Sequence, residues 1–144
     1  MPVKQVSVKA VQTNGFTIEA HAHQHTVVID QPLNAGGKDC GPTPLEYLFF
    51  SLSGCIITIG HIIAQQQKLN VRNISVDIEG ELNTDVLLGR STEVRPGFTG
   101  IRLVTHIDAD MTQAEKEQFL HDIDARCPIS DNVANLTPIE LVAD

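Results

Sequence analysis

Three cysteines are the side chains in this 144-residue sequence that are best suited to covalent chemistry. Cys40 lies in a glycine-rich segment, Cys55 lies within a long apolar stretch, and Cys127 comes directly before a proline. The thiolate is the reactive form of cysteine, and a nearby cation or a helix amino terminus favours it. An odd number of cysteines indicates thiol chemistry or core packing rather than a framework of structural disulfides.

Each cysteine also has a simpler interpretation, because a buried cysteine is more often a small hydrophobic side chain than a nucleophile. Cys127 is expected to cap a short helix that begins with Pro128, where its sulfur would feel the helix dipole. Cys55 lies a dozen residues past the expected helix start, so it would need a cation brought close by folding. Cys40 is expected to be exposed and to have no role.

A helix predicted over residues 41–68 must position Cys55. Thr43 and Glu46 have the spacing of a capping box, and Pro44 suits the first helical position. No residue from Tyr47 to Ala64 carries a fixed charge, and a helix that is apolar on all sides is expected to be buried on all sides. Because one small domain can hardly surround such a rod, we expect a second copy of the chain to cover it in a homodimer.

The rest of the sequence predicts an α+β protein with a single domain over residues 1–144. Alternating residues indicate an antiparallel β-meander before the long helix, with a turn at Asn14-Gly15, and further strands after it. Thr112 and Glu115 form a second capping box. The predicted strands are 3–11, 16–22, 25–29, 71–82, 101–107 and 139–142, the shorter helices are 112–126 and 128–134, and the irregular segments are 30–42 and 83–100.

Composition disfavours several classes of partner. The formal net charge of -8 argues against nucleic acid and anionic membrane surfaces, which attract clustered Lys and Arg. The chain has no Trp and one Tyr, so a stacking platform for single strands is not expected. Ser51, Thr58 and His61 dilute the apolar helix and no basic cluster flanks it, which disfavours a membrane span. Met1 leads into a polar segment without a signal sequence, so a cytoplasmic location is expected.

Two segments together resemble the OsmC/Ohr family, the osmotically inducible and organic-hydroperoxide-resistance proteins. The first is GGKDCGPTPLEYLFFSLSGC, which ends at Cys55, and the second is CPISDNVANL, which begins at Cys127. The resemblance extends over most of the chain. It implies an OsmC-like fold and an intertwined homodimer in which two long central helices pack between two sheets, with active sites at the subunit interface.

The resemblance also implies a thiol-dependent peroxidase of oxidative and osmotic stress defence that uses no cofactor. Cys55 matches the peroxidatic cysteine, whose thiolate attacks the O–O bond of an organic hydroperoxide and becomes a sulfenic acid. Cys127 matches the resolving cysteine, which forms a disulfide with Cys55 that an external dithiol reduces. Four residues are candidates for an apolar wall beside the sulfur, although core packing is the simpler role for most of them: Phe49, Phe50, Leu52 and Ile56.

The sequence departs from the family's peroxidases in the residues that activate the cysteine. Those peroxidases use an arginine from an N-terminal strand and a glutamate near the start of the long helix, whereas no arginine precedes Arg72 here. Glu46 is the candidate glutamate, but it lies one residue, or about 100° of helix rotation, past the family position at Leu45. Its simpler role is the capping box. The candidate substitutes for the missing cation are Arg95, Arg102 and His61.

Two alternative functions stay open: a non-catalytic dimer that binds a small hydrophobic ligand, and a redox-sensing or disulfide-exchange protein. His21, His23 and His25 alternate as metal-binding histidines on one strand face would. A turn expected near residues 23–24 would separate them, so we expect an exposed hairpin tip and no metal site.

Overall fold

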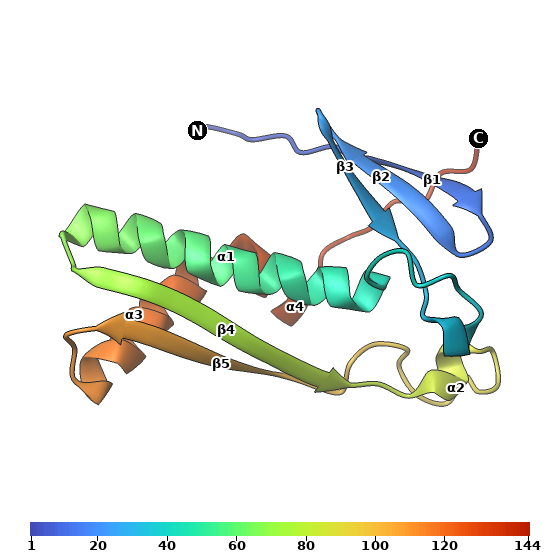
Figure 1. The fold of residues 1–144 in the computed structure, drawn as a ribbon. Helices are drawn as coiled ribbons and strands as arrows, with labels where there is room; N and C mark the ends of the chain where they lie inside the picture. The colour runs from blue at the N-terminus through green and yellow to red at the C-terminus, as the bar shows by residue number, and fades with distance from the viewer. The chain divides into compact units, whose positions relative to one another are not determined.

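The computed structural model describes residues 1–144, which form two compact units, Met1–Phe50 and Ser51–Asp144. The chain has the predicted α+β composition of antiparallel strands and helices (Figure 1). Helix α1, Pro44–Gln67, begins in the first unit and continues through the second. Each unit is described by itself.

The first unit contains a three-stranded antiparallel meander in the order β1-β2-β3. Its strands are β1 (Lys9–Asn14), β2 (Thr17–Ala22) and β3 (His25–Ile29). Gly15 has a φ of +61° in the turn between β1 and β2, which explains why an Asn-Gly pair is found there. The turn at residues 23–24 is also confirmed. The strand predicted from residue 3 is wrong in its first six residues, because β1 begins only at Lys9.

Asp30 organises the loop that follows β3 and contains the short 3-10 helix η1 (Leu33–Ala35). Its fully buried carboxylate accepts hydrogen bonds from four groups of this unit. The donors are the Thr17 hydroxyl at 3.0 Å and the backbone N–H groups of Gln31 at 2.7 Å, Cys40 at 3.2 Å and Lys38 at 3.5 Å. Burial alone would raise the pKa of Asp30, but these hydrogen bonds outweigh it and hold the pKa below its ordinary value.

Helix α1 begins with the predicted capping box. The backbone N–H of Thr43 donates to Glu46 Oε1 at 2.9 Å, and the backbone N–H of Glu46 donates to Thr43 Oγ1 at 3.3 Å. Pro44 is the first helical residue. The start of the helix therefore follows from local hydrogen bonding, because the reciprocal pair satisfies backbone donors that have no partner within the helix.

The second unit contains a long antiparallel ribbon of β4 (Val71–Glu81) and β5 (Gly100–Ala109). The short helix α2 (Thr84–Leu87), which the sequence analysis left within an irregular segment, lies in the connection between the two strands. Helices α3 (Gln113–Arg126) and α4 (Pro128–Ala134) follow where the sequence predicts them. The hydroxyl of Thr112 accepts the backbone N–H of Glu115 at 3.2 Å, as the second capping box requires.

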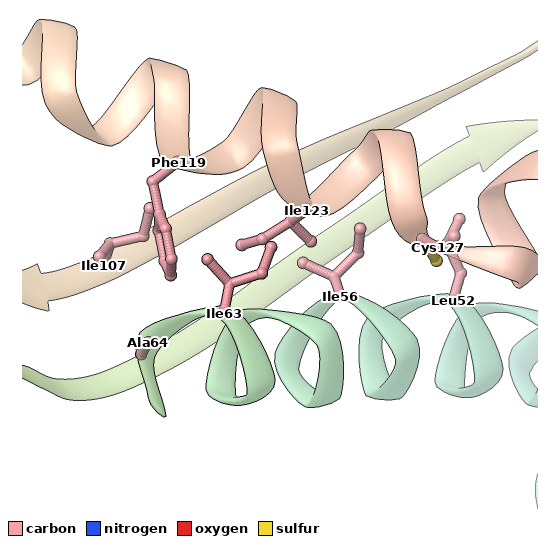
Figure 2. Close-up of a cluster of buried hydrophobic side chains, with 8 residues drawn as sticks. All are labelled: Leu52, Ile56, Ile63, Ala64, Ile107, Phe119, Ile123 and Cys127. Atoms are coloured by element: carbon pink, nitrogen blue, oxygen red, sulfur yellow. The ribbon is translucent and has the colours of Figure 1, made fainter. Parts of the chain in front are cut away.

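The core of the second unit lies between α1, α3 and one face of the ribbon (Figure 2). Ile56 and Ile63 of α1 point toward Ile123 of α3 in that view. Gly60 permits this close approach, because a Cβ atom at its position would lie 2.7 Å from Ile74 Cδ1 and 3.1 Å from Ile123 Cδ1. The buried cluster comprises Leu52, Ile56, Ile63, Ala64, Ile107, Phe119, Ile123 and Cys127.

In the single chain helix α1 is only partly buried, since Phe50 is 56% exposed and Ile57 is 37% exposed. The sequence analysis expects a second copy of the chain to cover this helix, and the single chain does not test that expectation. The strand expected at residues 139–142 is absent, and Leu141 there is 91% exposed. By length and composition, α1 also meets the criterion for a membrane span, as core helices of soluble proteins do.

Candidate active site

The sulfur atoms of Cys55 and Cys127 meet in the second unit at a distance of 2.8 Å. Cys55 lies near the middle of α1, and Cys127 ends α3 and caps α4. The two residues are 72 positions apart in the sequence, so the packing of α1 against the α3–α4 junction is what brings them together. Both are free thiols in this structure, at a separation from which they can be oxidised to a disulfide.

Cys127 is buried, with 2% of its surface exposed, and its sulfur accepts the backbone N–H of Ser130 at 3.3 Å. This is the cap expected for a cysteine that precedes a helix-opening proline. The backbone N–H of Cys127 in turn donates to the carbonyl oxygen of Asp124 at 3.2 Å. Cys127 is therefore held by backbone contacts on both of its sides, and its sulfur faces α1.

Cys55 is half-buried and its thiol is not activated within the single chain. Burial raises the pKa of the Cys55 thiol, and the hydrogen bond to Cys127 and the charge of Cys127 raise it further. A hydrogen bond from the backbone of Ile129 lowers the pKa, but the net shift is upward. No cationic side chain contributes to the pKa of Cys55.

The candidate cations lie elsewhere. Arg72 binds Asp108 at 2.8 Å and Asp110 at 3.3 Å, and Arg102 binds Glu79 at 3.4 Å. Arg102 is an exposed residue of β5, between two residues that pack against the core. Arg95 and His61 are also exposed. None of these residues takes the place of the family's arginine beside Cys55 in the single chain.

Glu46 is engaged in the capping box rather than with a cysteine. The backbone N–H of Thr43 is the main cause that lowers the pKa of Glu46. Glu46 precedes Cys55 by nine residues on α1, which is two and a half helical turns, so the two side chains leave the helix on opposite faces. Its observed role is that of a helix-capping residue.

The four candidate wall residues divide into two pairs. Leu52 and Ile56 are buried in the core of the second unit, where packing is their observed role. Phe49 and Phe50 lie in the part of α1 that belongs to the first unit. There the rings of Phe50 and Tyr47 contact edge to face, with centroids 5.7 Å apart.

The histidines form the expected hairpin tip. His21 pairs with Thr26 across β2 and β3, whereas His23 lies in the turn with a φ of 43°. No group of three or more His, Cys, Asp or Glu side chains in residues 1–144 is placed to hold a metal ion. Cys40 is exposed, and its backbone N–H is one of the donors to Asp30.

Sequence reasoning missed three residues that organise these regions: Asp30, Asp124 and Ser130. Ser130 follows Cys127 by three residues, the spacing of a capping contact, so its backbone contact was open to prediction. The side-chain contact between Ser130 and Asp124 links two helices, and no sequence pattern predicts it. Three of the four donors to Asp30 likewise come from a loop without periodicity, and the fourth, Thr17, comes from β2.

The chain belongs to the OsmC-like protein family, whose model matches residues 36–142. Among solved structures, the fold is similar to an OsmC-like protein from Mycoplasma pneumoniae, with 19% identity, a TM-score of 0.80 and coverage of 92% of this chain and 89% of that chain. It is also similar to an organic hydroperoxide resistance protein OsmC from Legionella pneumophila, with 20% identity, a TM-score of 0.69 and coverage of 92% and 91%.

A third similar structure is an organic hydroperoxide resistance protein from Elizabethkingia anophelis with thiocyanate bound. It has 17% identity and a TM-score of 0.65, and the match covers 90% of this chain and 88% of that chain. No curated protein matches the sequence. At these identities the solved structures establish the fold alone.

Proposed function

We propose that this protein is a thiol-dependent peroxidase that reduces organic hydroperoxides in oxidative and osmotic stress defence. The observation that carries the proposal is the 2.8 Å separation of the Cys55 and Cys127 sulfur atoms. The family membership and the similarity to organic hydroperoxide resistance proteins support the same activity. Cys55 is the more accessible of the two thiols and is therefore the one that would meet the peroxide.

The proposed reaction has two steps, which are followed by regeneration of the two thiols. The Cys55 thiolate attacks one oxygen of the hydroperoxide, the O–O bond breaks, and an alcohol leaves once it takes up a proton. The Cys127 thiolate then attacks the sulfur of the Cys55 sulfenic acid, so an S–S bond forms and hydroxide leaves. An external dithiol reduces the disulfide by exchange.

We also propose that the protein acts as a homodimer in the cytoplasm. Three exposed apolar regions support the dimer: the α1 face with Phe50 and Ile57, the segment before β1 with Val3 and Val6, and the carboxyl-terminal segment with Leu141. Exposed apolar surface of this extent is typical of a protein–protein interface. A cation that activates Cys55 would have to come from assembly or from substrate binding, because the single chain supplies none.

Sedimentation equilibrium tests the dimer. Ile57→Glu should shift the protein toward the monomer by at least about tenfold in dissociation constant, because it places a charge within an apolar interface. Leu87→Glu is the matched control, since Leu87 is an exposed residue of α2 outside these regions. Wild-type protein that stays monomeric at micromolar concentration would contradict the proposal.

The peroxidase test exposes the reduced protein to one equivalent of cumene hydroperoxide and follows intact mass and free thiols. Wild type should lose two thiols at once, whereas Cys127→Ser should stop at a Cys55 sulfenic acid and Cys55→Ser should not react. If Cys55 oxidises no faster than a small-molecule thiol, the peroxidase proposal fails. Retention of a hydrophobic ligand without thiol oxidation would then favour the ligand-binding dimer.

The 2.8 Å separation of the Cys55 and Cys127 sulfur atoms also supports a second candidate function, thiol–disulfide exchange with a partner dithiol. The raised pKa keeps the Cys55 thiol mostly protonated at neutral pH, so the single chain is expected to react slowly with peroxide. Rapid equilibration of the Cys55–Cys127 pair with dithiothreitol, combined with slow oxidation by cumene hydroperoxide, would identify this function.

A further inference from the structure

Three hydrogen bonds among Asp124, Cys127 and Ser130 form a closed ring at the junction of α3 and α4. The Asp124 carbonyl oxygen accepts the Cys127 N–H at 3.2 Å. The Cys127 sulfur accepts the Ser130 N–H at 3.3 Å, and the Ser130 hydroxyl donates to Asp124 Oδ1 at 2.5 Å. Asp124 accepts two of these hydrogen bonds, Ser130 donates two, and Cys127 donates one and accepts one.

The ring holds the Cys127 sulfur in a fixed position beside Cys55. Cys127 is buried, so its side chain can react with Cys55 only from the place where the junction holds it. Pro128 begins α4 and lacks an N–H, so it cannot itself anchor the first turn to Asp124. The Ser130 hydroxyl is therefore the side-chain contact that joins the first turn of α4 to the last turn of α3.

We infer that Ser130 and Asp124 are positioning residues for closure of the Cys55–Cys127 disulfide. This inference deepens the proposed function and rests on the same cysteine pair. In the closing step the Cys127 thiolate attacks the modified Cys55 sulfur, and the leaving group departs opposite to it along the S–S axis. A fixed Cys127 sulfur speeds that step because the attack geometry is already formed.

The expected effect follows from the loss of one charge-assisted contact. The Ser130 hydroxyl binds a carboxylate, and hydrogen bonds to charged groups are stronger than neutral ones. Without it, the first turn of α4 can move away from α3 and take the Ser130 N–H with it. Disulfide closure should then slow by about tenfold, and this step is measured separately from the first reaction at Cys55.

Diamide tests this step without any peroxide. One thiolate adds to the azo group of diamide, and the second thiolate displaces the resulting hydrazine, so two thiols are oxidised and diamide is reduced. All proteins carry Cys40→Ser, which removes the exposed third thiol, and Cys55 should then form the adduct because Cys127 is buried. Quenched samples analysed by intact mass give the lifetime of the adduct, and Cys127→Ser gives its lifetime without closure.

The substitutions below distinguish a role in positioning Cys127 from a general effect on protein stability. Ser130→Ala and Asp124→Ala should prolong the adduct about tenfold. Ser130→Thr keeps a hydroxyl and should close nearly as fast as wild type. Asp124→Asn keeps an acceptor oxygen without the charge, so it should be slowed less than Asp124→Ala. Asp122→Ala is the matched control, because Asp122 lies on the same helix and accepts only from Gln118 at 2.9 Å.

Wild-type closure rates in both Ser130→Ala and Asp124→Ala would overturn the inference, as would an equal slowing in Asp122→Ala. If Ser130→Ala does not fold, the comparison of Asp124→Ala with Asp124→Asn decides the outcome. A wild-type protein that closes rapidly with diamide but ignores cumene hydroperoxide would refute the peroxidase proposal and leave the role of the ring intact.

Discussion

Thr105 of β5 lies directly opposite Val76 of β4, and its hydroxyl is buried without a hydrogen-bond partner. The pair lies on the face of the ribbon that packs against the core, since Val76 contacts the buried cluster. A buried hydroxyl without a partner has lost its hydrogen bonds to water and gained nothing in return. This position is therefore a built-in source of instability in the second unit.

Thr105→Val should stabilise the protein by about 1 kcal/mol, because it replaces the orphan hydroxyl with a methyl group of similar size. Thr105→Ser, which keeps the hydroxyl and removes the methyl group, should be destabilising. Urea unfolding followed by circular dichroism measures both. A destabilised Thr105→Val variant would mean that the hydroxyl has a partner in solution, such as an ordered water.

Asp30 should make the loop after β3 sensitive to acid. Because hydrogen bonding holds the pKa of Asp30 below its ordinary value, the carboxylate stabilises the folded loop at neutral pH. That contribution is lost as the pH falls through the folded pKa, below about 3.8. Asp30→Asn should therefore exchange the amide hydrogens of Gln31 and Cys40 about tenfold faster at neutral pH, and the difference from wild type should shrink in acid. Hydrogen exchange that is equal in the two proteins at pH 7 would contradict this role.

Gly60 and Gly54 of α1 should respond oppositely to alanine. Gly60→Ala should cost about 1–2 kcal/mol, because its Cβ would collide with Ile74 and the favourable helix propensity of Ala offsets only part of that. A Cβ at Gly54 would meet no atom within 4 Å in the single chain. Gly54→Ala should therefore stabilise the monomer by about 1 kcal/mol. Thermal unfolding at low protein concentration tests both variants.

Removal of Cys127 should lower the pKa of Cys55. Burial is the largest cause of the raised pKa and stays in place, but the hydrogen bond to Cys127 and its charge are both lost in Cys127→Ala. The pH at which iodoacetamide alkylation of Cys55 reaches half of its maximal rate should fall relative to wild type. Peptide mass spectrometry distinguishes Cys55 from the other thiols, and an unchanged midpoint would show that burial alone sets the pKa.

Local sequence signals predicted much of this fold because the interactions behind them are local. The capping boxes at Thr43 and Thr112 place the starts of α1 and α3 with hydrogen bonds between residues three apart. The turn at Gly15 follows from the one residue type that tolerates its backbone angle. The cysteine pair was open to prediction through the family resemblance, and folding brings the two sulfur atoms together.

The remaining features depend on contacts between distant segments. The residues before β1 and those at 139–142 alternate like strands, yet neither segment forms a strand in this structure. Asp124 and Ser130 are in contact because α3 ends and α4 begins at Cys127. No periodic pattern in the sequence predicts this contact. The cation that would activate Cys55 was not found by sequence reasoning, and the single chain does not contain one at the site.

The distance of 72 residues between Cys55 and Cys127 has a thermodynamic consequence. A disulfide between them would close a large loop in the unfolded chain, and the lost chain entropy would favour the folded state by about 4 kcal/mol. By linkage the fold favours the disulfide by the same amount, which is on the order of 90 mV in reduction potential. The oxidation state would thus be readable as a melting temperature, and only a ligand that binds the disulfide form more tightly than the dithiol form would make the bond harder to reduce.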